Sequence, residues 1–105
     1  ESEKLSFIHT ALEIVGTHHE KFDGSGYPAG LKGKDIPLAG RLMAIIDVYD
    51  ALVSQRVYKP AFPHQDALAI LAAERGRHFD PEMVDALLEI EDEFKTIAER
   101  FMPLA

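Results

Sequence analysis

The architecture can be inferred outward from one segment, His18-His19-Glu20-Lys21-Phe22-Asp23-Gly24-Ser25-Gly26-Tyr27-Pro28. An apolar helical pattern precedes the two histidines, and a glycine-rich stretch follows them. Histidine and carboxylate side chains can hold divalent metal ions. Basic side chains further along, Arg56 and Lys59, can hold phosphate groups. The combination points to metal-assisted phosphoester chemistry. We expect this chain to carry only part of the site for that chemistry.

The residues before this segment predict a first helix over about residues 4–20. Apolar side chains recur there at helical steps in two overlapping series, one ending on His19 and the other on His18. The two series are Leu5, Ile8, Leu12 and Val15, and Phe7, Ala11 and Ile14. We therefore expect one wide buried stripe, which the two histidines extend at its C-terminal end.

A long loop and a second helix follow. Residues 21–37 are rich in glycine and contain two prolines, which predicts a loop between helices. Residues 38–54 predict a helix whose main apolar stripe comprises Leu38, Leu42, Ile45, Tyr49 and Leu52. Another face carries small residues around Asp47, namely Gly40, Ala44, Ala51 and Ser54. A carboxylate on such a face needs a cation or hydrogen-bond partners if it is buried.

The remaining segments predict two more helices. Pro63 opens a third helix that ends near Gly76. Asp80-Pro81-Glu82 predicts the start of a last helix, whose apolar stripe runs from Met83 to Phe101. The fold class is therefore all-α, a helical bundle fragment with a long Gly/Pro-rich loop between its first two helices. We expect residues 1–105 to belong to one domain, of which they form a part.

Composition excludes several classes of function. The 105 residues are 47% apolar, which suits one small folded domain. There is no cysteine for disulfides or thiolate metal ligands, and no apolar run long enough for a membrane span. The net charge of −7 argues against binding a nucleic acid polymer. No signal peptide is visible, so a cytoplasmic setting is expected, and the initial Glu1 suggests a fragment.

Each candidate residue also has a plain structural interpretation. A histidine on an apolar face is usually a hydrogen-bonded core residue, although two adjacent histidines suit neighbouring metal ions better. Asp47 alone could accept a hydrogen bond between helices. Turns use Gly, Asp and Pro for backbone reasons, and Arg56 and Lys59 alone would most often be solvated charges.

Taken together, the motifs closely resemble the C-terminal half of HD-GYP domains over nearly the whole chain. The matching elements include His18-His19-Glu20, Asp23-Gly24-Ser25-Gly26-Tyr27-Pro28, Gly30-Leu31, Gly33, Ile36-Pro37, Arg41, Asp47-Val48-Tyr49-Asp50-Ala51-Leu52, Arg56, Tyr58-Lys59 and His78-Phe79-Asp80-Pro81. The resemblance implies an all-helical HD phosphohydrolase fold. It also implies hydrolysis of cyclic di-GMP to a linear dinucleotide or GMP, with two or three divalent metals, iron or manganese, in each complete domain.

The resemblance assigns roles to individual residues. His18, His19 and Asp47 would be metal ligands, and Arg56 and Lys59 would bind ligand phosphate. The Gly26-Tyr27-Pro28 loop would shape the nucleotide pocket and contact diguanylate cyclases. We expect His18, His19 and Asp47 to converge through antiparallel packing of the first two helices.

The His-Asp pair that gives the family its name would lie upstream of Glu1, and no His-Asp dipeptide occurs in this chain. The chain alone is therefore expected to be incomplete for catalysis. Two other functions stay open, a protein-interaction module in which the glycine loop docks a partner, and a nucleotide sensor without turnover. We also expect the fragment to self-associate through apolar surface that upstream helices would otherwise cover.

Overall fold

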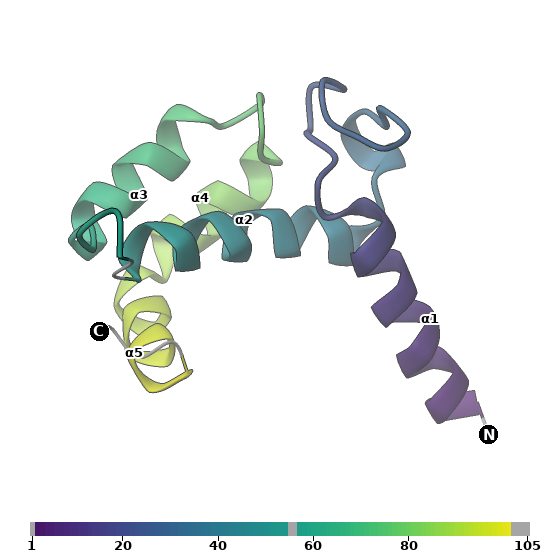
Figure 1. Ribbon diagram of the computed structural model, residues 1–105, viewed down its shortest axis with the longest axis horizontal. Helices are drawn as coiled ribbons and strands as arrows, with labels where there is room; N and C mark the ends of the chain where they lie inside the picture. Colours follow the sequence, from purple (N-terminus) through teal and green to yellow (C-terminus); the bar gives the residue numbers. More distant parts are fainter. Residues whose placement is uncertain (1, 55–56, 102–105) are drawn as a thin grey trace.

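The computed structural model describes residues 2–54 and 57–101, and all named elements in these ranges are helical (Figure 1). The expected all-α fold is therefore confirmed. The elements are α1 (Ser2–Thr17), the short 3-10 helix η1 (Gly33–Asp35), α2 (Leu38–Val53), α3 (His64–Ala73), α4 (Pro81–Glu89) and α5 (Glu91–Phe101). The long loop between α1 and α2 is present, interrupted only by η1. No described helix combines the length and apolar character needed to cross a bilayer.

The core lies between α2 and the three helices that follow it. Ile45 and Tyr49 of α2 are buried there, and the Tyr49 ring lies 4.5 Å from that of Phe94 on α5. The predicted α2 stripe is correct at these two positions and wrong at its start, because Leu38 is 63% exposed and Leu42 is 45% exposed. The buried core residues are Ala44, Ile45, Tyr49, Val53, Ala67, Leu68, Leu71, Phe79, Val84, Phe94 and Ala98.

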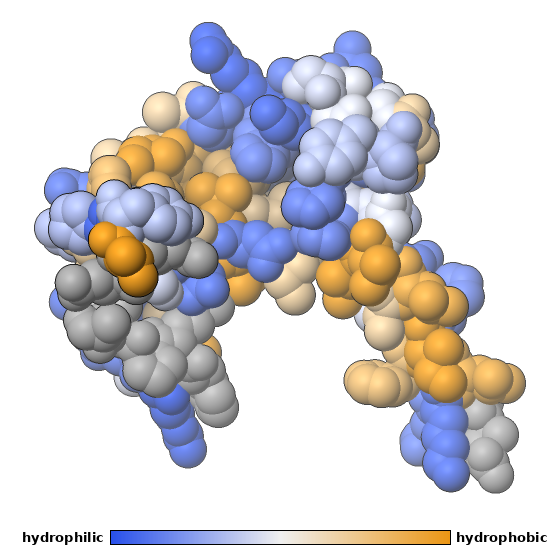
Figure 2. All heavy atoms as spheres, viewed as in Figure 1, coloured by the Kyte–Doolittle hydropathy of each residue, from blue (hydrophilic) through white to orange (hydrophobic). Residues whose placement is uncertain are grey.

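Helix α1 projects away from this core, so its apolar stripe is not buried within this chain, as expected for apolar surface that upstream helices would otherwise cover. Figure 1 shows α1 contacting the rest of the molecule only near its C-terminal end, so α1 and α2 are not an antiparallel pair. Residues 3–12 are all exposed, and Figure 2 shows the apolar surface along α1 open to view. The physical reason is that no other described segment lies along α1 to cover it.

The predicted last helix is interrupted at Ile90. Its start is as expected, because the Asp80 side chain accepts a hydrogen bond from the Glu82 N–H and Pro81 occupies the first turn. Ile90 then leaves helical geometry with φ −113° and ψ 35°, and α5 begins at the next residue. The bend allows Phe94 to pack on Tyr49, a contact between segments that a periodic stripe does not reveal.

Candidate metal centre and its loop

His18 lies just beyond the end of α1 with its ring fixed from one side. The His18 Nδ1–H donates to the carbonyl oxygen of Ile14 at 2.7 Å, and this assigns the ring proton to Nδ1, because a carbonyl can only accept. The other nitrogen, Nε2, lies 3.9 Å from an Asp47 carboxylate oxygen on α2. Metal-ligating histidines use this arrangement, in which one nitrogen is anchored and the other keeps its lone pair.

His19 stacks beside His18. Their ring centroids are 3.9 Å apart, and on its other side His19 contacts the Tyr27 ring at 5.1 Å with an interplanar angle of 22°. His18 therefore lies beside both His19 and Asp47, although not through antiparallel helix packing. The contact with Asp47 forms because both histidines lie at the end of α1 that reaches α2.

The donor set fits part of a metal site. Two donor atoms that are each about 2.1 Å from one ion can lie at most about 4.2 Å apart. The separation of 3.9 Å between His18 Nε2 and Asp47 satisfies this limit at a wide bond angle. Within residues 2–54 and 57–101, however, no group of three or more His, Asp or Glu side chains is arranged to hold a metal ion. His18 and Asp47 therefore offer two donor atoms at a separation that suits one ion, and the described residues do not enclose an ion.

Glu20 anchors the glycine loop, a role that the sequence analysis missed. Its side chain is buried, at 2% exposure, and its two carboxylate oxygens accept hydrogen bonds from the backbone N–H groups of Ala29 and Leu31, each at 2.8 Å. The signal in the sequence was a carboxylate directly after two candidate ligands and before a loop with free backbone donors. Its partners nine and eleven residues away follow no helical or strand period.

Gly26 is the point where the loop lies closest to the end of α1. A Cβ atom there would clash with the backbone of His19, Glu20 and Lys21, so only glycine fits. Tyr27 follows, joined to Pro28 by a cis peptide bond, and its side chain is 61% exposed. The predicted substrate-binding loop is thus held against the histidine pair while its aromatic ring remains accessible.

The start of the loop is also tied to the segment before α4. The backbone N–H groups of Phe22 and Asp23 donate to the carbonyl oxygens of His78 and Arg77 at 3.0 and 2.8 Å. Burial is the main cause that lowers the pKa of His78, and the nearby charge of Lys21 lowers it further. His78 therefore favours its neutral form beside the loop.

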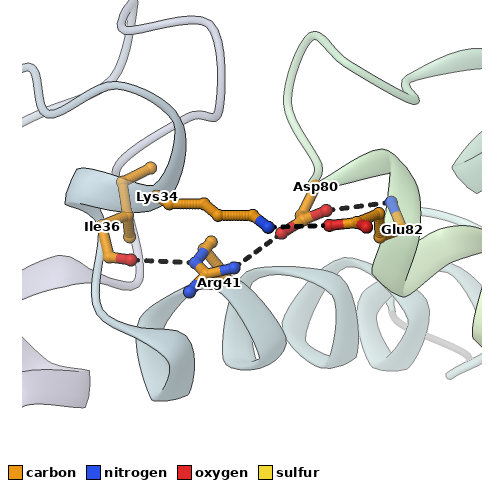
Figure 3. Close-up of polar contacts among 5 residues, drawn as sticks. All are labelled: Lys34, Ile36, Arg41, Asp80 and Glu82. Atoms are coloured by element: carbon orange, nitrogen blue, oxygen red, sulfur yellow. Dashed lines mark hydrogen bonds and ion pairs between the residues drawn. The ribbon is translucent and has the colours of Figure 1, made fainter.

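A polar network joins the end of the loop to α2 and α4 (Figure 3). The Arg41 guanidinium donates to the Ile36 carbonyl oxygen at 2.9 Å and to the buried Asp80 carboxylate at 2.7 Å. Lys34 of η1 pairs with Glu82 at 2.9 Å on the same side. Burial tends to raise the pKa of Asp80, but hydrogen bonds from Arg41 and from backbone N–H groups together outweigh it and lower that pKa.

The two predicted phosphate-binding residues have different outcomes. Arg56 lies outside the described residues. Lys59 is half-buried, and its Nζ donates to the carbonyl oxygens of Leu52, Ser54 and Pro60 at 3.3, 3.5 and 2.9 Å. A cation at this position interacts favourably with the C-terminal end of α2. Lys59 therefore has a structural contact that sequence reasoning did not anticipate.

Comparison with known proteins gives concordant matches. The HD domain family model matches residues 2–83. A cyclic di-GMP phosphodiesterase of Vibrio cholerae serotype O1 is 58% identical over 100 residues, covering 95% of this chain and 20% of its own length. A probable cyclic di-GMP phosphodiesterase of the same organism is 55% identical over 105 residues, covering 95% of this chain and 24% of its own length.

A solved structure supports the fold. The crystal structure of the cyclic GMP-AMP specific phosphodiesterase V-cGAP3 of V. cholerae superposes with a TM-score of 0.69 at 22% identity, covering 85% of this chain and 20% of that chain. The present chain spans about a fifth to a quarter of the length of these relatives. The family match over most of its residues shows that the chain belongs to the HD-domain family and carries the GYP-containing portion of an HD-GYP domain.

Proposed function

We propose that the chain is part of a metal-dependent cyclic di-GMP phosphodiesterase. The supporting observation is the His18 ring, whose Nδ1–H is held by the Ile14 carbonyl oxygen while Nε2 faces Asp47 at 3.9 Å. A metal-ligating histidine needs this arrangement, in which one ring nitrogen is anchored and the other keeps its lone pair. Two relatives that cover 95% of the chain bear the names of cyclic di-GMP phosphodiesterases, which favours this substrate.

In the complete domain His18, His19 and Asp47 would hold divalent metals, with iron or manganese proposed and two or three ions in each domain. Such ions activate water as a nucleophile at neutral pH and stabilise charge on phosphoryl oxygens. The chain's own contribution is to orient donors. The Ile14 carbonyl oxygen fixes the His18 tautomer, and α2 places the Asp47 carboxylate, which is 53% exposed, 3.9 Å from His18 Nε2.

Substrate binding is proposed for the Gly26-Tyr27-Pro28 loop and for Arg56 and Lys59. The exposed Tyr27 ring lies beside His19, so a nucleotide reaching the metal ligands would also contact it. Lys59 can contact phosphate if its Nζ exchanges one of its carbonyl partners for a phosphate oxygen. Lys59→Ala in the parent-length protein should weaken cyclic di-GMP binding, because the phosphate contact is lost. It should also lower the melting temperature, because the hydrogen bonds to the backbone carbonyl oxygens are lost.

The first test compares the parent-length protein with the 105-residue chain. With manganese or iron added, the parent should hydrolyse cyclic di-GMP. The isolated chain should not, because no three candidate ligands within its described residues form a metal-holding group. His19→Ala in the parent should reduce turnover by at least about a hundredfold, since a lost ligand removes several kcal/mol of charge stabilisation.

His9→Ala is the matched control, because His9 lies on α1, the helix that precedes His19, with its side chain 76% exposed. It should leave turnover unchanged. A parent that lacks metal-dependent turnover of cyclic di-GMP would contradict the proposal. An isolated chain that is as fast as the parent would contradict its incompleteness.

Two partner interactions are also proposed. A diguanylate cyclase domain could dock on the loop, because Tyr27 is 61% exposed while the backbone around it is anchored. Co-sedimentation of such a domain with the chain should be lost on Tyr27→Ala; binding that persists would argue against the loop as its contact. The second interaction is self-association through α1, on which Leu5, Phe7, Ile8, Leu12 and Val15 are 53–76% exposed.

A further inference from the structure

We infer that Glu20 is a positioning residue for His19. Its carboxylate holds the glycine loop, and the loop in turn holds the Tyr27 ring against the His19 imidazole. The functional meaning of this inference rests on the proposed role of His19 as a metal ligand. The structural coupling itself can be measured without any turnover.

The first step is the carboxylate. Glu20 is 2% exposed, and a buried carboxylate is tolerated only where hydrogen bonds satisfy its charge. Oε2 accepts from the Ala29 N–H and Oε1 from the Leu31 N–H, both at 2.8 Å. Two charge-assisted bonds from one planar group fix the orientation of the Ala29–Leu31 segment as well as its distance.

The second step leads from the loop back to the histidine. Gly26 lies against the backbone of His19, Glu20 and Lys21, and the Tyr27 N–H donates to the His19 carbonyl oxygen at 3.3 Å. The Tyr27 ring then stacks on the His19 ring at 5.1 Å. Because Tyr27 is 61% exposed, burial does not hold its ring in place, and the anchored backbone must do so.

The third step is the contrast between the two histidines. The His18 ring is fixed by its hydrogen bond to the Ile14 carbonyl oxygen. In the described part of the chain, the His19 ring has no such bond, and its ring contacts are with His18 and Tyr27. Metal-ligating histidines normally need an outer partner to set their orientation. For His19 that partner is the Tyr27 ring, and Glu20 holds the segment that presents it.

The test uses NMR on the 105-residue chain. Glu20→Gln keeps the shape but replaces one acceptor by an NH2 group that faces a backbone N–H. Amide exchange of Ala29 and Leu31 should then be at least about tenfold faster, since charge-assisted bonds are lost. The His19 ring-proton shifts should move towards those measured in Tyr27→Leu, because both variants remove the ring current of Tyr27.

Glu89→Gln is the matched control, because it removes the same charge from an exposed position on α4. It should change neither measurement, and exchange in α2 and α3 should stay at wild-type rates in Glu20→Gln. Slow exchange at Ala29 and Leu31 in Glu20→Gln would overturn the inference. So would faster exchange with an unchanged His19 shift, because the loop would then be uncoupled from the histidine.

A second pair of variants decides the case even if Glu20→Gln unfolds. In Tyr27→Phe the chemical shifts of the His19 ring protons should stay near the wild-type values, because stacking does not need the hydroxyl group. In Tyr27→Leu these shifts should change, because the aromatic ring is lost. Both changes are at an exposed side chain. An unchanged shift in Tyr27→Leu would overturn the inference in a folded protein.

Kinetics in the parent-length protein separate this inference from the proposed function. If His19 is a ligand, Glu20→Gln should lower kcat for cyclic di-GMP while KM stays near the wild-type value, and Tyr27→Phe should retain more kcat than Tyr27→Leu. A wild-type parent without turnover would refute the proposed function alone, because the NMR result on Glu20 would still stand.

Discussion

At Gly26 the loop backbone lies directly on the backbone that follows α1, without room for one methyl group. Gly26→Ala should therefore push the loop away from His19 and lower the free energy of unfolding by about 1–3 kcal/mol, the usual range for overpacking. Thermal unfolding of the 105-residue chain measures this, and turnover in the parent should fall with it.

Gly16→Ala provides the matched control on α1, because a Cβ atom there would meet nothing within 4 Å. This change should be neutral or stabilise the chain by up to about 1 kcal/mol through helix propensity. Equal melting temperatures for Gly26→Ala and wild type would show that the loop is not seated on the His19–Lys21 backbone.

Residues of the site differ in how far the sequence reveals them. His18, His19 and Asp47 could be proposed from the chain alone, because a rare cluster of donor types follows a recognisable helix and matches a family motif. The partners of Glu20 could not, since they are backbone N–H groups that any residue offers. Lys59 shows the same limit, because its carbonyl partners carry no side-chain signature.

Among the elements, α4 shows where local sequence is sufficient and where it is not. Asp80-Pro81-Glu82 predicts the helix start correctly, because the cap and its partner are two residues apart. The same carboxylate pairs with Arg41, which is 39 residues away on α2. That contact depends on how α2 and α4 pack, which local sequence does not specify. The bend at Ile90 is not marked by a Gly or Pro residue, so it could not be predicted either.

The Arg41–Asp80 pair should make stability depend on pH in the acid range. Because the folded pKa of Asp80 is lowered, its stabilisation is present above the pKa of an unfolded Asp, about 3.9, and is lost as the pH falls through the folded value. Asp80→Asn keeps a capping side chain but removes the charge. It should lower the free energy of unfolding at pH 7 by about 2–3 kcal/mol.

Urea unfolding between pH 7 and pH 3 measures both effects. The difference between wild type and Asp80→Asn should shrink as the pH falls, because protonation removes the same charge from the wild type. Asp85→Asn is the control for a more exposed pair, since Asp85 is 52% exposed and bonds to Arg75. It should cost less than about 1 kcal/mol. A constant difference at all pH values would contradict the role assigned to the Asp80 charge.

For the molecule as a whole, the sequence predicts the positions and apolar faces of the helices better than it predicts which segments those faces pack against. The apolar stripe on α1 is present as expected, but the chain does not cover it (Figure 2). Periodicity identifies an apolar face without identifying its partner. The last helix does not cover this stripe, because α5 packs on α2 through Phe94 at the far end of the molecule (Figure 1).

The exposed face of α1 leads to a prediction about association. Leu5, Ile8, Leu12 and Val15 follow the alternating three- and four-residue spacing of a coiled-coil seam, and each is 53–71% exposed. Burying such side chains releases about 1.5–3 kcal/mol each, and a second copy offers a matching seam in a two-fold dimer. Sedimentation equilibrium over a concentration range should therefore show a monomer–dimer equilibrium for the 105-residue chain.

Salt dependence and two substitutions identify the contact. With a net charge of −7 on each copy, electrostatic repulsion opposes pairing, so added salt should strengthen an association that depends on apolar burial. Leu5→Gln combined with Leu12→Gln should give a monomer with unchanged α2–α5 structure. Ile97→Gln, at a site on α5 that is 56% exposed, should leave the dimer intact. A wild-type chain that stays monomeric at high concentration and high salt would rule out pairing through α1.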